Sequence, residues 1–216
     1  TADIVNFSTS CLFELIKRNI PIVLLGGGFD EVSLSRVDID LEQASYELTH
    51  YLLGRGYHRF LYLSGLKEAS TFKRRIVGFQ KAMAEAGYSV VDDQIIETHP
   101  DIDGGYEETR RIFSEKRNAS EVVLCVNDFM AFGVLKAMKE LQLRVPEDVG
   151  VVGFDDISFA SMAGVPITTV HIPVDELAQK GINMLCRQIE GQASGMSNAV
   201  QVEFVPTHLI VRNSTA

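Results

Sequence analysis

The stretch EVVLCV, residues 121–126, is followed by DFMAFGVLKAMKEL, residues 128–141, and then by VGVVGF, residues 149–154. The first and third segments are short apolar runs rich in β-branched residues, which is typical of strands buried on both faces. The middle segment has apolar residues at helical spacing and starts with Asp128, a residue type favoured at helix N-termini. The sequence here predicts a strand, a helix and a second strand, as found in parallel α/β sheets.

The same alternation extends in both directions along the chain. Upstream, the pattern predicts strands at 20–25, 59–63 and 94–97 and helices at 40–53, 72–86 and 106–113. Downstream, prolines 166 and 173 bracket a short β-prone segment, residues 174–190 resume helical spacing, and 200–211 alternate as a strand does. We therefore predict an α/β fold whose parallel sheets are flanked by helices.

Composition limits the functions open to this chain. Its 216 residues are 46% hydrophobic and 23% charged, and the balance of 20 basic against 29 acidic residues gives a net charge of −9. An acidic chain is a poor binder of nucleic acid or membrane surfaces by itself, because phosphate contacts come from clustered lysine and arginine. The three widely spaced cysteines provide no disulfide framework, so a reducing cytoplasm is expected. The sequence predicts no membrane span, no metal site and no cofactor.

Polar residues follow several of the predicted strands. They are Gly26–Asp30, Ser64–Thr71, Asn127-Asp128 and Asp155-Asp156. Ligands of parallel sheets bind beyond the carboxyl ends of the strands, so these positions are candidate binding residues. Asn and Asp are also preferred helix caps, and capping is the alternative interpretation of both pairs. The two roles are compatible if the second residue caps the helix while the first points into the crevice.

The basic run Lys73-Arg74-Arg75 opens the predicted helix after the 59–63 strand. It is interpreted either as a solvated turn or as a clamp for an anion or sugar hydroxyls, which suit the planar fork of arginine. If Arg75 is such a clamp, Arg75→Ala should weaken binding and leave the melting temperature of the ligand-free protein nearly unchanged. No nucleophile–base pair is evident, so an enzyme is not expected, although Asp155 and Asp156 would be the acid–base pair of that rival interpretation.

Six motifs in order resemble the lactose-repressor (LacI/GalR) family of bacterial transcription regulators. The stretch VPEDVGVVGFDD, residues 145–156, resembles the family signature V-P-x-D-[VI]-x-V-x-G-[FY]-D-[DN]. The others are Gly56-Tyr57-His58, Arg75-x-x-Gly78-Phe79, Asn127-Asp128, PITTV at 166–170 and LIVRNS at 209–214. Tyr57 departs from the pattern, because it interrupts the usual Gly-His pair.

The resemblance implies a two-lobed fold of the periplasmic-binding-protein type (type I), with the effector bound between lobes that three crossovers join. We expect residues 1–56 and 172–203 in the N-terminal lobe and residues 57–171 and 204–216 in the C-terminal lobe. The family also carries a helix-turn-helix headpiece and two βα units ahead of the strand that residues 3–7 resemble. None of these precedes residue 3, so the first lobe is expected to be incomplete.

The resemblance further implies that Arg75, Asn127 and Asp155 contact the effector, together with Asp40 as the matching position in the first lobe. These side chains donate to and accept from hydroxyl groups, which suits a sugar or sugar derivative. The expected function is effector sensing and homodimerisation in a cytoplasmic regulator that contacts operator DNA only through the headpiece. The alternative is an extracytoplasmic sugar-binding protein of a transport system, since the two classes share a fold.

Overall fold

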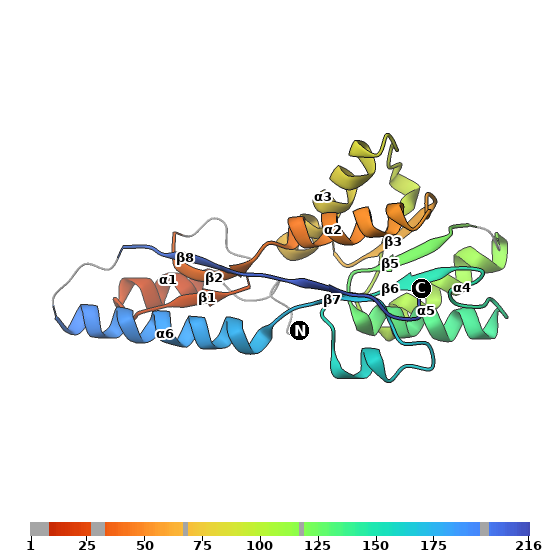
Figure 1. Cartoon of the computed structure of the whole chain (residues 1–216). Helices are drawn as coiled ribbons and strands as arrows, with labels where there is room; N and C mark the ends of the chain where they lie inside the picture. Colours follow the sequence, from red (N-terminus) through yellow and green to blue (C-terminus); the bar gives the residue numbers. More distant parts are fainter. Residues whose placement is uncertain (1–8, 27–32, 67–68, 117–118, 195–198) are drawn as a thin grey trace. The chain divides into compact units, whose positions relative to one another are not determined.

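The computed structural model describes residues 9–26, 33–66, 69–116, 119–194 and 199–216. The chain forms two compact units, of which the first contains Thr1–Asp40, Ala69–Thr71 and Pro173–Pro206. The second contains Leu41–Glu68, Phe72–Ile172 and Thr207–Ala216. Both units contain parallel sheets with helices packed on them (Figure 1), which confirms the predicted α/β class. The strand expected at residues 3–7 and most of the Gly26–Asp30 loop lie outside the described residues.

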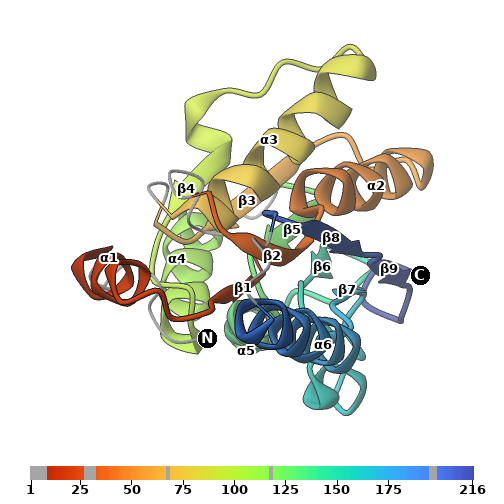
Figure 2. The same ribbon diagram turned by 90° about the vertical axis from the view of Figure 1, so that its left-hand side faces the viewer.

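The first unit is built on a parallel sheet with the strand order β1-β2-β8. Its elements are α1 (Thr9–Lys17), β1 (Val23–Leu25), β2 (Ser35–Ile39), α6 (Val174–Ala193) and β8 (Val202–Val205). Helix α6 packs along β1 and β2 (Figure 2). A Cβ atom at Gly181 of α6 would lie 2.4 Å from Leu25 Cδ2. Glycine at this position therefore allows the helix to approach the strand closely.

Strand β2 and helix α1 are two elements that the sequence pattern did not predict. Arg36 and Asp38 interrupt the apolar pattern of β2, yet Val37 and Ile39 are buried in it. The strand is central in its sheet, since Val37 pairs with Leu25 on one side and with Glu203 on the other. Pairing on both edges thus outweighs the weak strand pattern of the segment itself.

The second unit is built on a parallel sheet with the strand order β4-β3-β5-β6. Its strands are β3 (Phe60–Ser64), β4 (Ile95–Glu97), β5 (Val122–Cys125) and β6 (Gly150–Val152). Its main helices are α2 (Leu41–Gly54), α3 (Ser70–Glu85), α4 (Ile102–Glu115) and α5 (Asp128–Glu140), and short 3₁₀ turns lie at Asp92–Gln94 and Ser158–Ser161. None of the helices among the described residues combines the length and apolar character that crossing a bilayer needs.

The strand order of this sheet reverses at β3. From β3 the chain moves to β4 on one side and then returns to β5 and β6 on the other side. Helices α2 and α3 cover one face of the sheet and α4 and α5 cover the other (Figure 1). The carboxyl ends of β3 and β5 are neighbours at this reversal, which is where open α/β sheets bind ligands.

The end of the chain returns to the second unit as part of an antiparallel pair. Strand β7 (Thr169–His171) pairs with β9 (His208–Ile210), and Thr168, just before β7, forms a parallel bridge with Val152 of β6. The Ser214 hydroxyl accepts from Thr168 N at 2.8 Å and donates to Val151 O. These bonds fix the C-terminal residues beside the end of the parallel sheet.

Helix α2 packs on α3 in the second unit. A Cβ atom at Gly78 of α3 would lie 2.0 Å from the carbonyl oxygen of Glu42 in α2, so the two backbones are in close contact. Tyr46 Oη of α2 also donates to Glu85 Oε2 of α3 at 2.7 Å. The units in the structure therefore divide at residue 40, whereas the expected lobe boundary at residue 56 placed this helix with the first lobe. The later divisions between the units lie at 172 and 206, and the expected lobe ranges stay a prediction.

Candidate functional site

Arg75 lies buried beside the carboxyl end of β5. Helix α3 begins at Ser70, so Arg75 is in the second helical turn and not in the first, as the basic run suggested. Only 8% of the residue is exposed. Its Nη1 donates to the carbonyl oxygen of Val126 and its Nη2 lies 3.1 Å from Asp155 Oδ1. The guanidinium also stacks on the Phe154 ring, 3.8 Å from the ring centroid, so three separate contacts orient it.

Asp155 follows β6 with an unusual backbone conformation. Its φ is 102° and that of Asp156 is 55°, and both values lie in the left-handed region that residues other than glycine rarely adopt. Its amide donates to Val170 O at 2.9 Å. Burial raises the pKa of the Asp155 carboxyl, and the charge and hydrogen bond of Arg75 oppose that rise. The side chain remains 27% exposed, so a ligand can still reach the carboxylate.

Asn127 caps helix α5. Its Oδ1 accepts from Met130 N at 2.8 Å and its Nδ2 donates to Pro100 O at 2.8 Å. Capping of α5 is thereby confirmed, but the first residue of the Asn127-Asp128 pair does the capping and the second is buried in a polar network. Because an amide nitrogen carries two hydrogens, Asn127 keeps one further N–H beyond the bond to Pro100.

The capping interpretation is wrong for Asp155-Asp156. The 3₁₀ turn Ser158–Ser161 has Ile157 at its N-cap position and no side-chain capping bond. Asp155 and Asp156 are instead engaged with arginines, Asp155 with Arg75 and Asp156 with Arg212. Two carboxylates held by separate cations do not resemble a general acid–base pair, whose members need pKa values set apart at one reacting group.

Asp40 is exposed and comes directly after β2, at the boundary of the first unit. The structure thus places the four predicted effector residues in two groups. Arg75, Asn127 and Asp155 gather at the carboxyl ends of β5 and β6, where Arg75 bonds both Asp155 and the residue before Asn127. The assignment of Asp40 to the same ligand stays a prediction.

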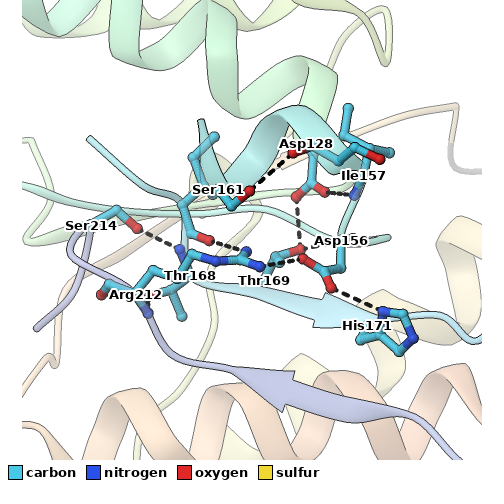
Figure 3. A network of polar contacts seen from close by, with 11 residues as sticks. Asp128, Asp156, Ile157, Ser161, Thr168, Thr169, His171, Arg212 and Ser214 are labelled. Carbon is cyan, nitrogen blue, oxygen red and sulfur yellow. Dashed lines mark hydrogen bonds and ion pairs between the residues drawn. The ribbon is translucent and has the colours of Figure 1, made fainter. Parts of the chain in front are cut away.

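A polar network that the sequence did not reveal adjoins this cluster along the chain, since Asp128 follows Asn127 and Asp156 follows Asp155. Figure 3 shows the network. Asp128 is fully buried, with Oδ1 accepting from the Thr169 hydroxyl at 2.7 Å and Oδ2 accepting from Ile157 N at 2.8 Å. Burial raises the pKa of Asp128 to about 6, with Asp155 and Asp156 adding to the rise and the two hydrogen bonds opposing it. The pKa of Asp128 is therefore one of the most strongly shifted among the acids of the described residues. Side chains with strongly shifted pKa values are concentrated at functional sites.

Asp156 continues the network toward the C-terminal segment (Figure 3). Its Oδ1 accepts from Arg212 Nη2 at 2.7 Å and its Oδ2 lies 2.9 Å from His171 Nδ1. Arg212 Nη1 donates to Ile167 O at 2.9 Å as well. The motifs at 166–170 and 209–214 contained Ile167 and Arg212 but assigned them no role, because a motif by itself does not show which distant segments meet.

Two other kinds of binding site, a metal centre and a cavity in the first unit, do not involve this cluster. No set of three His, Cys, Asp or Glu side chains within the described ranges is arranged to hold a metal ion. One cavity of about 370 Å³ lies in the first unit, between α1, α6 and the segment before β2, and it is lined by residues such as Ile20, Pro21 and Gln188. None of the four predicted site residues lines it. The polar cluster at the strand ends is the better candidate binding site.

An α/β sheet that gathers a buried arginine, an acid and an amide at its strand reversal is typical of proteins that bind small polar molecules. Comparison with known proteins agrees with this class. The family model of the periplasmic binding protein-like domain matches residues 49–215. The chain therefore belongs to the periplasmic binding protein-like domain family.

Three similar proteins illustrate the relationship. The HTH-type transcriptional regulator DegA of Bacillus subtilis is 30% identical over 209 residues, which cover 97% of this chain and 60% of the relative. A transcriptional regulator of the LacI family from Sanguibacter keddieii has a TM-score of 0.83 at 27% identity, covering 91% of this chain and 74% of that structure. The complex of transcriptional regulator CelR with cellobiose has a TM-score of 0.83 at 27% identity, and the match covers 93% of this chain and 60% of that structure. The predicted two-lobed fold and the family resemblance are confirmed, and the chain spans about 60% of the length of its DegA relative.

Proposed function

We propose that this chain is the effector-sensing region of a cytoplasmic transcription regulator and that it binds a sugar or sugar derivative. The observation that carries the proposal is Arg75. It is buried and paired with Asp155, and its Nε–H has no hydrogen-bond partner among the described residues. A buried donor without a partner is unfavourable, so a ligand oxygen that bonded to this atom would remove that cost.

The chemistry of the cluster favours a ligand with several hydroxyl groups. Asp155 accepts hydrogen bonds, Arg75 donates them, and Asn127 has a further N–H to donate. Adjacent hydroxyls of a sugar ring present donors and acceptors close together, which matches this mixed set. The bound cellobiose of the similar CelR complex supports the same ligand class. Asp40 is proposed as a further contact on the basis of the family motif.

A regulatory role is favoured over transport. The three similar proteins described above are all named as transcriptional regulators. We propose that effector binding shifts the chain between two conformations of different affinity for the ligand, and that this shift alters operator binding by a helix-turn-helix headpiece. No catalytic step is part of the proposal.

We also propose that the regulator works as a homodimer, as twofold operator sites require. Two large apolar side chains, Phe159 and Met162, are 66% and 74% exposed on the loop that follows β6. Exposed apolar side chains that lie near each other are typical of protein interfaces. These two residues are therefore the proposed centre of a dimer contact.

The test is a thermal-shift screen of sugars, sugar phosphates and nucleosides against this chain. A ligand at 100 times its Kd adds about 2.7 kcal/mol to the free energy of unfolding, which is easily measured. Compounds that raise the Tm are then tested on Arg75→Lys and on the control Arg144→Lys. Arg144 forms an exposed ion pair with Asp148, at 2.8 Å, outside the cluster.

We expect the ligand-induced shift to disappear in Arg75→Lys, because lysine cannot reproduce the planar guanidinium contacts. The shift should persist in Arg144→Lys. If no compound of the three classes shifts the Tm, or if Arg75→Lys responds like wild type, the proposed binding site is wrong.

A further inference from the structure

The loop that presents Asp155 contains two successive strained residues. Asp155 and Asp156 have φ values of 102° and 55°. Such a conformation is unfavourable for residues other than glycine and persists only where the surroundings hold it. Because Asp155 contacts Arg75 from this conformation, the groups that hold the loop also determine the geometry of the binding cluster.

Asp128 contacts the loop on both sides of the strained pair. Its backbone N–H donates to the carbonyl oxygen of Phe154 at 2.9 Å, one residue before Asp155. Its carboxylate accepts from the N–H of Ile157 at 2.8 Å, one residue after Asp156. A single buried residue at the start of α5 thus fixes the positions at which the loop enters and leaves the strained segment.

Thr169 completes this support from β7. Its hydroxyl donates to Asp128 Oδ1 at 2.7 Å and accepts from Asp156 N at 3.3 Å (Figure 3). Gly153 provides space for the carboxylate, since a Cβ atom there would lie 2.0 Å from Asp128 Oδ1. Both oxygens of Asp128 are therefore occupied by donors that come from the loop or from the strand beside it.

We infer that Asp128 is a positioning residue of the binding site, which holds the Asp155 loop through Ile157 and Thr169 so that the Asp155 carboxylate faces Arg75. The inference rests on the proposed function, because it gives Asp128 a purpose at that site. Asp128 acts through the backbone of residues 154 and 157 and through the Thr169 hydroxyl, and the ligand itself need not touch it.

If Asp128 served only to stabilise helix α5, the expected results would be different. An acid in the first turn of α5 also interacts favourably with the helix dipole. If that were its whole purpose, replacing Asp128 would lower the Tm and leave the contacts of Arg75 unchanged. Whether the Arg75 guanidinium is held in place in the ligand-free protein therefore distinguishes the positioning role of Asp128 from a role in helix stability alone.

The first experiment is ¹⁵N NMR of the arginine guanidinium groups in the ligand-free chain. In the wild type, Arg75 Nη1 and Nη2 are held by different acceptors, Val126 O and Asp155, so hindered rotation should give separate resonances. In Asp128→Asn one oxygen becomes an NH₂ group that faces a donor, so the loop loses a contact. We expect the separate Arg75 resonances to merge. The control Asp148→Asn removes a carboxylate that also accepts from a backbone N–H, that of Arg144, and it should leave them separate.

A second pair of variants keeps the inference testable if Asp128→Asn folds poorly. Thr169→Val removes the hydroxyl and should merge the Arg75 resonances. Thr169→Ser retains the hydroxyl and should leave them separate, even if loss of the methyl group lowers the Tm. Rescue by serine is not expected of a role that depends only on packing.

The inference is overturned if the Arg75 resonances stay separate in Asp128→Asn or in Thr169→Val, or if serine and valine have the same effect. None of these measurements needs a ligand. A failed sugar screen would therefore refute the proposed function and leave this result intact, whereas unchanged Arg75 resonances would refute the positioning role alone.

Discussion

Arg75 is both a candidate ligand contact and a structural residue. It bonds Asp155 and Val126 O and stacks on Phe154 while almost entirely buried. The sequence suggested a basic run from which one arginine reaches a ligand, so that its removal would leave folding unaffected. The structure revises that expectation, because removing Arg75 leaves a largely buried carboxylate and a carbonyl without their donor.

We expect Arg75→Ala to lower the free energy of unfolding of the ligand-free chain by about 2 kcal/mol, the value of a hydrogen bond to a charged group. Urea denaturation measures this change. The matched variant Arg144→Ala breaks an exposed ion pair and should lower stability by less than about 1 kcal/mol. Equal, small effects of the two variants would contradict the structural role of Arg75.

The raised pKa of Asp128 predicts the direction in which the stability of the protein changes with pH. Burial raises its pKa to about 6 from an ordinary value near 3.8, with Asp155 and Asp156 adding to the rise. Between about pH 4 and pH 6 the folded state then binds more protons than the unfolded state. The contribution of Asp128 to stability therefore falls as the pH rises through this window, by about 3 kcal/mol in all, and is constant above it.

Denaturation of wild type and Asp128→Asn at pH 4.5 and pH 7 tests this sign. The stability of wild type relative to the variant should be greater at pH 4.5 than at pH 7, because the variant has no proton to lose at this position. If the difference is the same at both pH values, Asp128 does not titrate in this window.

At the scale of secondary structure, glycines allow α4 and α5 to pack closely. A Cβ atom at Gly133 of α5 would lie 2.0 Å from Ile102 O, and one at Gly105 of α4 would lie 2.2 Å from Met130 O. Both obstacles are backbone atoms, which cannot move aside as a flexible side chain can. The contact matters for the site because Asn127 caps α5 and bonds Pro100 just ahead of α4.

Gly133→Ala should therefore lower the free energy of unfolding by about 1–3 kcal/mol, the usual cost of overpacking, although alanine is the better helix former. The control is Gly54→Ala at the end of α2, where a Cβ atom meets nothing within 4 Å. That substitution should be neutral or stabilising by up to about 1 kcal/mol. Thermal and urea denaturation of both variants provide the comparison, and a neutral Gly133→Ala would contradict the close helix contact.

At the scale of the whole molecule, self-association is the testable consequence of the proposed function. We expect sedimentation to show a homodimer of this chain, and Met162→Glu to shift it toward monomer because a charge would be buried at the proposed contact. Gln142→Glu serves as a charge-matched control on the turn after α5. A wild-type chain that is monomeric at high concentration would contradict the dimer, and a dimer unaffected by Met162→Glu would place the interface elsewhere.

Much of the fold and part of the site could be predicted from the sequence. The β5–α5–β6 segment was recognisable because strong strand and helix patterns agree with the later tertiary structure. Strand β2 and helix α1 were missed, since charged residues in β2 and the short length of α1 weaken both patterns. Arg75, Asn127 and Asp155 were found from the motifs together with the rule that ligands bind beyond strand ends.

The α/β class, the family and three candidate binding residues could be inferred from local periodicity and from motifs within short segments. How those side chains are held could be seen only in the folded chain. Asp128, Thr169, Asp156 and Arg212 come from segments up to 84 residues apart, 128 to 212, and their hydrogen bonds exist only once the sheet brings these segments together. Local pattern indicates candidate ligand contacts, whereas the support behind them depends on long-range contacts that no single segment contains.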